Sequence, residues 1–282
     1  MRTLLLPSGS HIPVLGQGTW GMGEAPERKQ QEVDALRLGM DLGMTLIDTA
    51  EMYGEGGAEQ VVALALAGRR DQAYIVSKVY PHNADRRGVQ AACERSLGRL
   101  GTDHIDLYLL HWRGAVPLAD TLEGFEALKK AGKIGDYGLS NCDLADLREA
   151  GDLPGGAAIA ANQVLYNLAR RGAEWDILPW CRARAIALMA YSPLESSAAE
   201  QAGMLAAPAL KQVASRHGAS AAQIALAWLL QQDGVVVIPK AVTSAHVRDN
   251  RAALDIVLTA QDLAQLDLAF APPRKATPLD MR

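Results

Sequence analysis

The sequence has little of what marks several common classes of protein. Its 282 residues include three cysteines, Cys93, Cys142 and Cys181, without a CxxC pair, and this odd number suits a reducing compartment better than a disulfide framework. It has no apolar run of about 18 residues and no signal-peptide pattern at its start. We therefore expect a cytoplasmic chain that does not contact membranes.

Charge, histidine spacing and the lack of a serine motif argue against three more classes of protein. The 28 Lys and Arg residues against 32 Asp and Glu residues give a net charge of −4 without long runs of one sign, which argues against a nucleic-acid partner. The six histidines form neither HxH nor HExxH, so we expect no metal site. A G-x-S-x-G elbow is absent too, which disfavours a serine hydrolase. The 49% hydrophobic content predicts a large globular core.

Short aliphatic runs alternate with longer segments of helical periodicity, which is typical of βαβ units. A closed (β/α)8 TIM barrel and an open doubly wound sheet both fit this alternation. The barrel is favoured, because Gly18-Thr-Trp-Gly21-Met-Gly23 lacks the G-x-G-x-x-G spacing and precedes the first main strand. We expect one α/β barrel domain over 1–282, with an N-terminal β-hairpin over 4–15. The predicted strands are 44–48, 73–79, 105–111, 134–140, 159–164, 186–192 and 235–239, with a weaker eighth at 255–258.

Helix punctuation supports the alternation. The segments 120–123 (Asp-Thr-Leu-Glu) and 220–223 (Ser-Ala-Ala-Gln) have the form of capping boxes ahead of apolar residues. Gly132 and Gly234 follow those two segments where a C′ glycine would end each helix.

Polar side chains stand at or just after almost every predicted strand end. In a parallel barrel these ends meet at one face, where catalytic groups gather. Taken singly, each has a plain structural explanation: Asp48 could cap a helix near Gly57, Lys78 could extend to solvent, and His111 could be a satisfied core histidine. The full set is harder to explain in this way, and it comprises Asp48, Lys78, His111, Ser140, Asn141, Gln163, Tyr191, Ser192 and Lys240.

Tyr53, in the loop after Asp48, is the predicted general acid. A tyrosine hydroxyl ordinarily has a pKa of about 10, and a nearby cation stabilises the phenolate that forms when the proton leaves. We expect Lys78 to lower the pKa of Tyr53, Asp48 to pair with Lys78, and His111 to orient a substrate carbonyl. Such a site protonates an oxyanion, and reduction would need a hydride from a cofactor. Asn141 and Gln163 suit a carboxamide, Tyr191 a pyridine ring and Lys240 a phosphate.

Eight short motifs stand in order along the chain, most of them at predicted strand ends. They are Gly18-Thr-Trp20, Asp48-Thr-Ala-Glu-Met-Tyr53-Gly, Val76-Ser-Lys78, Leu109-Leu-His111-Trp112, Gly138-Leu-Ser140-Asn141, Asn162-Gln163, Tyr191-Ser-Pro-Leu194 and Ile238-Pro-Lys240. With these motifs the sequence resembles the aldo-keto reductase family from about Leu15 to Asn250. The resemblance implies that Tyr53, Asp48, Lys78 and His111 are catalytic.

The resemblance also implies a nicotinamide cofactor, with the segment 195–208 as a mobile lid over its pyrophosphate. NADPH is favoured because Lys240 is present and Arg248 lies nearby. NADH stays open because Ala241 follows Lys240 and His246 stands where the family commonly has arginine. The implied cofactor-binding residues are Gly18, Thr19, Trp20, Asp48, Ser140, Asn141, Gln163, Tyr191, Ser192, Pro193, Leu194, Lys240, Thr243, His246 and Asn250.

Aromatic side chains predict the character of the substrate site. We expect Trp20, Tyr80 and Trp112, together with His111, to line an apolar mouth for small aldehydes and ketones of the methylglyoxal type. The expected enzyme is a monomer or weak homo-oligomer with a small carbonyl substrate. The alternative is a redox sensor that holds nucleotide on the same barrel and turns it over slowly or not at all.

Overall fold

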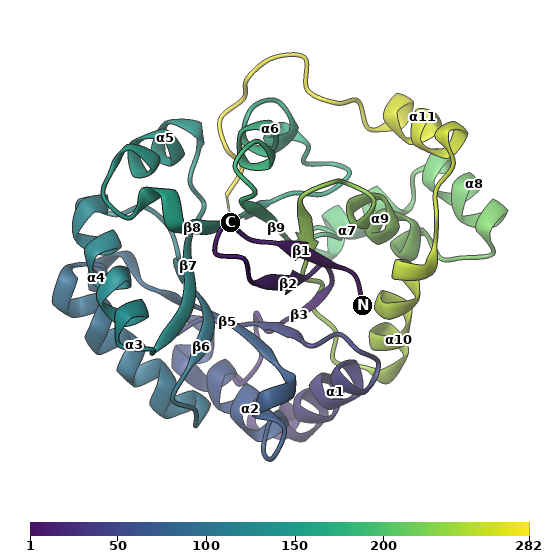
Figure 1. The fold of residues 1–282 in the computed structure, drawn as a ribbon. Helices are drawn as coiled ribbons and strands as arrows, with labels where there is room; N and C mark the ends of the chain where they lie inside the picture. Colours follow the sequence, from purple (N-terminus) through teal and green to yellow (C-terminus); the bar gives the residue numbers. More distant parts are fainter. Residues whose placement is uncertain (282) are drawn as a thin grey trace.

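The computed structural model describes residues 1–281, which form a barrel of eight parallel strands (Figure 1). The strands are hydrogen-bonded in chain order from β3 to β10, and the bridge between Leu15 and Val237 joins the two ends of the sheet. The strands are β3 (Gly16–Gly18), β4 (Leu46–Asp48), β5 (Tyr74–Val79), β6 (Ile105–Leu110), β7 (Ile134–Ser140), β8 (Ile159–Leu165), β9 (Ala187–Tyr191) and β10 (Val235–Val237).

Helices surround the barrel in Figure 1 and cover the outer face of its strands. None of the helices in residues 1–281 is long and apolar enough to span a membrane. The helices are α1 (Lys29–Asp41), α2 (Gly57–Ala65), α3 (Arg86–Leu100), α4 (Leu118–Lys130), α5 (Leu144–Asp152), α6 (Ile177–Arg182), α7 (Ala198–Leu205), α8 (Pro208–His217), α9 (Ala221–Leu230), α10 (Ser244–Ala252) and α11 (Ala260–Ala269).

The first barrel strand differs from the prediction. Residues 255–258 form no strand: Asp255 ends a 3-10 helix, and the chain then runs to α11. The eighth strand of the barrel is instead β3, whose Gly-Gln-Gly sequence lacks the apolar residues that predict a strand. Close packing explains the glycines, because a Cβ at Gly16 would lie 2.3 Å from Leu46 Cδ2 and one at Gly18 would lie 2.9 Å from the Ile238 carbonyl oxygen.

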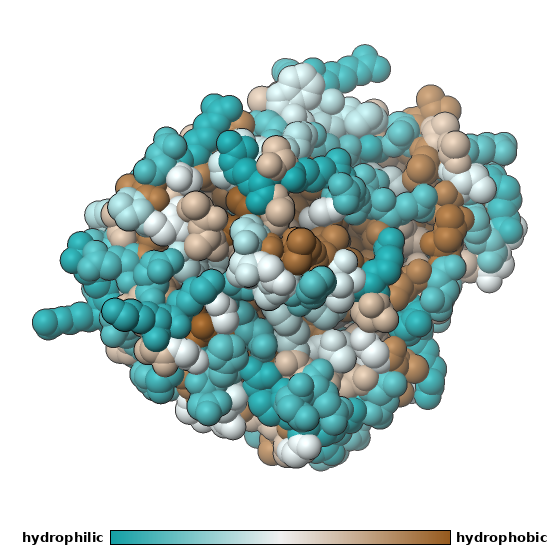
Figure 2. Space-filling view, in the orientation of Figure 1, coloured by the Kyte–Doolittle hydropathy of each residue, from teal (hydrophilic) through white to brown (hydrophobic). Residues whose placement is uncertain are grey.

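The N-terminal hairpin is confirmed as β1 (Thr3–Leu5) and β2 (His11–Pro13), paired antiparallel. Leu6 and Ile12 pack into the barrel interior beside Val76 and Leu107. The hairpin therefore closes the amino-terminal end of the barrel. Figure 2 shows this end in space-filling form, where hydrophobic atoms gather near the centre of a mostly hydrophilic face.

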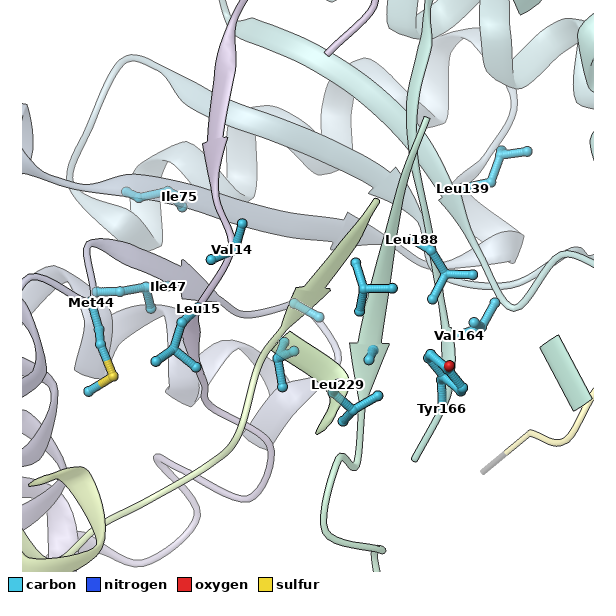
Figure 3. Packing of buried hydrophobic residues seen from close by; sticks show 14 of the residues in the cluster. Val14, Leu15, Met44, Ile47, Ile75, Leu139, Val164, Tyr166, Leu188 and Leu229 are labelled. Atoms are coloured by element: carbon cyan, nitrogen blue, oxygen red, sulfur yellow. The ribbon is translucent and has the colours of Figure 1, made fainter. Parts of the chain in front are cut away.

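Alternation along each strand separates two hydrophobic layers. On β5, Ile75 and Val79 join the large cluster between strands and helices, whereas Val76 belongs to the smaller cluster inside the barrel. Figure 3 shows part of the large cluster, including Ile47 and Leu139. The same alternation turns residues 48, 78, 111 and 163 toward the barrel interior, where a polar site replaces the apolar layer.

Two of the predicted helix signals are correct and two are wrong. Ser220 forms the capping box of α9, and Gly132, with φ of +72°, follows the C-cap of α4. The start of α4 lies earlier than predicted, at Leu118 after Pro117, so Asp120 sits inside its first turn. Gly234 also has a positive φ but lies beyond the C-cap of α9 at Gln231.

Candidate active site

Polar side chains surround one cavity at the carboxyl end of the barrel, opposite the hairpin. The cavity measures about 530 Å³, within the range of sites for small molecules and cofactors. Its lining comes from the ends of β3, β4, β7, β8, β9 and β10 and from the loops that follow strands. The lining residues are Gly18, Trp20, Asp48, Tyr53, His111, Ser140, Asn141, Gln163, Tyr191, Ser192, Pro193, Leu194, Glu195, Ser196, Gln201, Ile238, Pro239 and Lys240.

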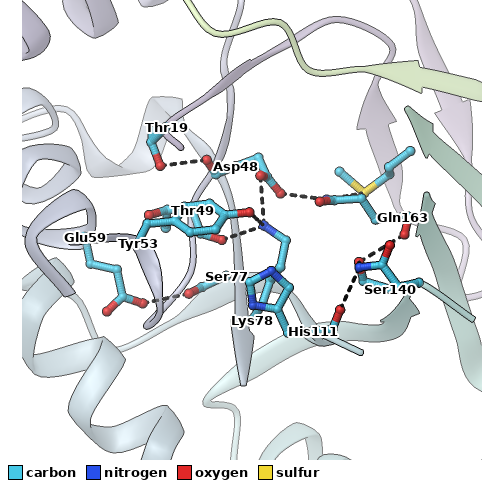
Figure 4. A network of polar contacts seen from close by, with 12 residues as sticks. Thr19, Asp48, Thr49, Tyr53, Glu59, Ser77, Lys78, His111, Ser140 and Gln163 are labelled. Carbon is cyan, nitrogen blue, oxygen red and sulfur yellow. Dashed lines mark hydrogen bonds and ion pairs between the residues drawn. The ribbon is translucent and has the colours of Figure 1, made fainter. Parts of the chain in front are cut away.

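A buried ion pair lies at the floor of this cavity (Figure 4). Lys78 is 0% exposed, and its Nζ donates to Asp48 Oδ2 at 2.8 Å, to the Thr49 carbonyl oxygen at 2.9 Å and to the Tyr53 hydroxyl at 3.0 Å. An ammonium has three protons, so these bonds satisfy Lys78 completely. Asp48 therefore does not cap α2, whose N-cap is Gly56 without a side-chain hydrogen bond.

The electrostatics of Tyr53 correct one expectation. Burial raises the pKa of the Tyr53 hydroxyl, Lys78 lowers it and Asp48 raises it, and the net pKa lies above the ordinary value rather than below it. Burial also lowers the pKa of Lys78, but Asp48 and Tyr53 more than compensate and leave it raised. At neutral pH Tyr53 thus keeps its proton and Lys78 its charge, as proton donation beside a cation requires.

His111 lies beside this pair as a neutral ring. Burial, helped by the charge of Lys78, lowers the pKa of His111 to about 3. Its ring centroid lies 5.6 Å from that of Tyr53 in an edge-to-face arrangement, and its backbone carbonyl accepts from Asn141 Nδ2 at 3.1 Å. A neutral imidazole carries one N–H and can donate one hydrogen bond to a carbonyl oxygen.

Amide side chains line the neighbouring wall and connect to the ion pair. Gln163 Nε2 donates to Asp48 Oδ1 at 2.7 Å, and Ser140 Oγ donates to the Gln163 backbone carbonyl at 2.9 Å. The Tyr191 hydroxyl donates to Asn141 Oδ1 at 2.9 Å. Asn141 holds a left-handed backbone with φ of +55°, which asparagine tolerates better than most residues and which turns its amide into the cavity.

The cavity fits the expected nicotinamide nucleotide. Amide groups of Asn141 and Gln163 and the ring of Tyr191 stand beside the Tyr53 hydroxyl, while the cation Lys240 stands at the exposed rim. A carboxamide-bearing ring with a phosphate arm has groups complementary to each of these. Residues 1–281 contain no group of three or more His, Cys, Asp or Glu side chains that could hold a metal ion.

Several predicted contact residues lie outside the cavity lining. Thr19 is buried and its hydroxyl donates to the Asp48 backbone carbonyl at 2.9 Å. Thr243 caps α10, His246 is exposed in its first turn, and Asn250 is buried near its end. All three follow Lys240 within ten residues, at the start of α10 and along it.

The predicted aromatic mouth is only partly in contact with the cavity. Trp20 lines it while 59% exposed, with its ring edge-to-face against Tyr53 at 5.1 Å. Trp112 and Tyr80 do not line it; they continue a row of rings outward, with Trp112 at 4.9 Å from His111 and Tyr80 at 5.9 Å from Trp112.

The loop after β9 supplies cavity-lining residues that were not predicted individually from the sequence. Glu195, Ser196 and Gln201 belong to the segment expected to be a mobile lid, yet this segment contains helix α7, capped by Ser197. Arg170 holds it further, donating to Glu195 at 3.1 Å and to Glu200 at 2.9 Å. Ile238 and Pro239 also line the cavity, because β10 ends beside β3.

The fold and the site together define a barrel oxidoreductase of the aldo-keto reductase type. Residues 14–270 match the model of the aldo/keto reductase family, and the chain belongs to this family.

Among its relatives is the methylglyoxal reductase YeaE of Escherichia coli, 50% identical over 96% of this chain and 95% of that protein. The glyoxal reductase of Bacillus subtilis is 33% identical over 94% of this chain and 91% of that protein. An aldo/keto reductase from Klebsiella pneumoniae, crystallised with NADP and acetate, has a TM-score of 0.97 and 47% identity over 100% of this chain and 99% of that one. A second Klebsiella pneumoniae structure, with NADPH, has a TM-score of 0.96 at the same identity and coverage.

Proposed function

We propose that this protein reduces small aldehydes and ketones of the methylglyoxal type to alcohols with NADPH. The observation that carries the proposal is the Tyr53 hydroxyl, 3.0 Å from an ammonium that is itself paired with Asp48, on the wall of a cavity of cofactor size. The reductase relatives and the NADP-bound and NADPH-bound structures support it.

The chain's own residues hold and move the proton. Bound NADPH supplies the hydride, which protein side chains lack. Neutral His111 donates a hydrogen bond that orients the substrate carbonyl toward Tyr53. Tyr53 gives its proton to the oxygen, and Lys78 stabilises the resulting phenolate. Asp48 keeps the ammonium in place, because an unpaired buried charge is costly.

Cofactor binding divides along the cavity. Ser140, Asn141 and Gln163 would hold the carboxamide, and Tyr191 would stack on the nicotinamide ring. Gly18, Trp20 and Asp48 line the same region, and Thr19 supports it from behind through its hydrogen bond to the Asp48 carbonyl. Ser192, Pro193 and Leu194 line the cavity and would lie along the pyrophosphate. Lys240, and Thr243, His246 and Asn250 at and within α10, would hold the adenosine end.

The side chains of Trp20 and His111 form the walls of the substrate site next to Tyr53. Trp112 and Tyr80 lie farther out along the row of rings. Such walls suit a short carbonyl compound better than a charged or long one. The three cysteines are free and buried, which supports a cytoplasmic setting. We further propose a monomer or weak homo-oligomer.

Steady-state assays test the proposal. Methylglyoxal, other small aldehydes, ketones and sugars are offered with NADPH and with NADH in parallel, and consumption of the dinucleotide is followed by absorbance. We expect turnover of methylglyoxal and a preference for NADPH. Failure to reduce any small carbonyl with either donor contradicts the function, and tight NADPH binding without turnover favours a sensor instead. A clear NADH preference overturns the cofactor assignment alone.

A further inference from the structure

Ser77, the neighbour of Lys78 on β5, faces away from the cavity. Because side chains alternate along a strand, Ser77 points to the helix layer, where its Oγ donates to Glu59 Oε1 at 2.6 Å. Both side chains are completely buried. Figure 4 shows the contact between Ser77 and Glu59 beside the Lys78 ammonium, which points toward Asp48 and Tyr53.

Glu59 connects this strand to the segment that carries Tyr53. It lies in the first turn of α2, six residues after Tyr53. Its second oxygen accepts from Arg99 Nε of α3 at 2.5 Å, which neutralises the buried carboxylate. Arg99 also donates to Ser96 Oγ at 3.1 Å, so its guanidinium is fixed on α3.

Arg99 also supports the Tyr53 segment directly. A Cβ at Gly56 would lie 2.4 Å from Arg99 Cδ, so the arginine side chain packs against this glycine. Between Tyr53 and α2, Gly54, Glu55 and Gly56 all have positive φ values, of 56°, 52° and 88°, and no side chain caps α2. This connection has little regular structure of its own to fix Tyr53.

These contacts close a ring around the reacting pair. One side is the hydrogen bond from Lys78 to Tyr53, and the opposite side is the hydrogen bond from Ser77 to Glu59, with short stretches of chain joining them. We propose that Glu59, Ser77 and Arg99 are positioning residues that set the distance between the Tyr53 hydroxyl and the Lys78 ammonium. This inference rests on the proposed function, in which Tyr53 donates the proton.

Ser77→Ala tests the inference. Opening the ring loosens Lys78 from Tyr53, and displacements of about 1 Å at a reacting group can cost on the order of 100-fold, so we expect kcat to fall about tenfold. The groups that face Tyr53 are Lys78 from β5, Asp48 from β4 and His111 after β6. Since Lys78 is the one that lowers the pKa of Tyr53, the high-pH limb of the kcat profile should move to higher pH. The KM for NADPH should stay within about twofold, because none of the altered atoms lines the cavity.

Two variants separate positioning from general loss of structure. Ser77→Thr keeps the hydroxyl and should restore both kcat and the pH limb. Thr121→Val is the matched control, because it also deletes one buried hydroxyl, the donor to the Ala84 carbonyl at 2.8 Å, which lies outside the cavity lining. We expect Thr121→Val to keep the native pH limb. A native kcat and pH limb in Ser77→Ala, or a reduced kcat whose pH limb stays in place, overturns the inference.

Arg99→Gln is a second variant that alters the other side-chain contact of Glu59. It should lower kcat and move the pH limb in the same direction, and an unchanged limb counts against the inference. Tyr53→Phe, measured alongside, distinguishes a failure of the proposed function from a failure of the positioning role. If Tyr53→Phe stays active, the proposed function is wrong; if it is inactive while Ser77→Ala behaves as wild type, only the positioning role is wrong.

Discussion

The two ends of the cavity are built differently. At the inner end, Asp48, Lys78 and Gln163 are buried and bonded to one another, so each side chain has its place fixed by the others. At the outer end, Lys240 lines the cavity rim and His246 follows on α10, outside the lining. Both are exposed, and within residues 1–281 neither side chain takes part in a hydrogen bond or ion pair; only the His246 backbone N–H bonds to Thr243. The inner end is preorganised, whereas the exposed Lys240 and His246 side chains at the outer end are not held by other side chains.

Because of this difference, we expect the inner end to govern the reaction rate and the outer end to govern the preference between cofactors. A preorganised proton donor and cation need no rearrangement when charge develops, and their effect on rate is large. Exposed cations near a phosphate are screened by water and salt, so each contributes little. Substitutions at the inner end should therefore change catalysis strongly, and substitutions at the outer end should shift cofactor preference weakly.

Tyr53→Phe should have the largest effect. It removes the proton donor and retains the ring against Trp20, so kcat should fall by about 10²- to 10⁴-fold, the usual range for a general acid. Binding of NADPH, measured by fluorescence titration, should change little. The matched control is Tyr108→Phe, which deletes the same hydroxyl from a buried tyrosine packed on Phe125, outside the cavity. Full activity of Tyr53→Phe would contradict the proposed acid.

The inner end was also the more predictable from sequence. Continuous aliphatic runs predicted β5 to β9 within two residues, because strands buried on both faces need apolar side chains throughout. The polar residues that end those runs then had to share one face. The direction of the Tyr53 pKa shift was not predictable, since it depends on how much burial opposes Lys78.

In other parts of the molecule, the local sequence pattern was not enough to predict the strands or the side-chain contacts. β3 lacks apolar residues because close packing requires glycine there, while 255–258 is aliphatic but lies outside the completed barrel, with Val257 75% exposed. The contact between Ser77 and Glu59 joins a strand to a helix and has no signature in either segment. Trp112 and Tyr80 have the expected residue type, but the direction of their rings depends on tertiary packing.

The pH dependence of stability provides a second, smaller test of the inner end. The pKa of His111 is about 3 in the folded protein, against an ordinary value near 6.5 after unfolding. Stability from the neutral ring is therefore complete above about pH 6.5 and is lost as the pH falls toward 3, because the unfolded chain then binds the proton more readily. By pH 5 the loss should reach about 2 kcal/mol.

Urea unfolding of the wild type and His111→Gln at pH 7.5 and pH 5 measures this loss. The variant should lose about 2 kcal/mol less than the wild type between the two pH values. His82→Gln, which replaces an exposed histidine, should follow the wild type. Parallel behaviour of wild type and His111→Gln would show that the ring is not held in a desolvated neutral state, and the contrast between the two ends would weaken.

The smallest effect is expected at the outer end, from His246→Arg. Position 246 lies in the first turn of α10, exposed and close in sequence to Lys240, so a permanent positive charge there should favour the extra phosphate of NADPH. Because the site is exposed, the ratio of kcat/KM for NADPH over NADH should rise only about three- to fivefold and should fall again at high salt. His11→Arg makes the same charge change on the hairpin at the opposite end of the barrel and should leave the ratio unchanged. A rise of a hundredfold or more would mean that the outer end is as preorganised as the inner one, because only a desolvated, fixed cation discriminates so strongly.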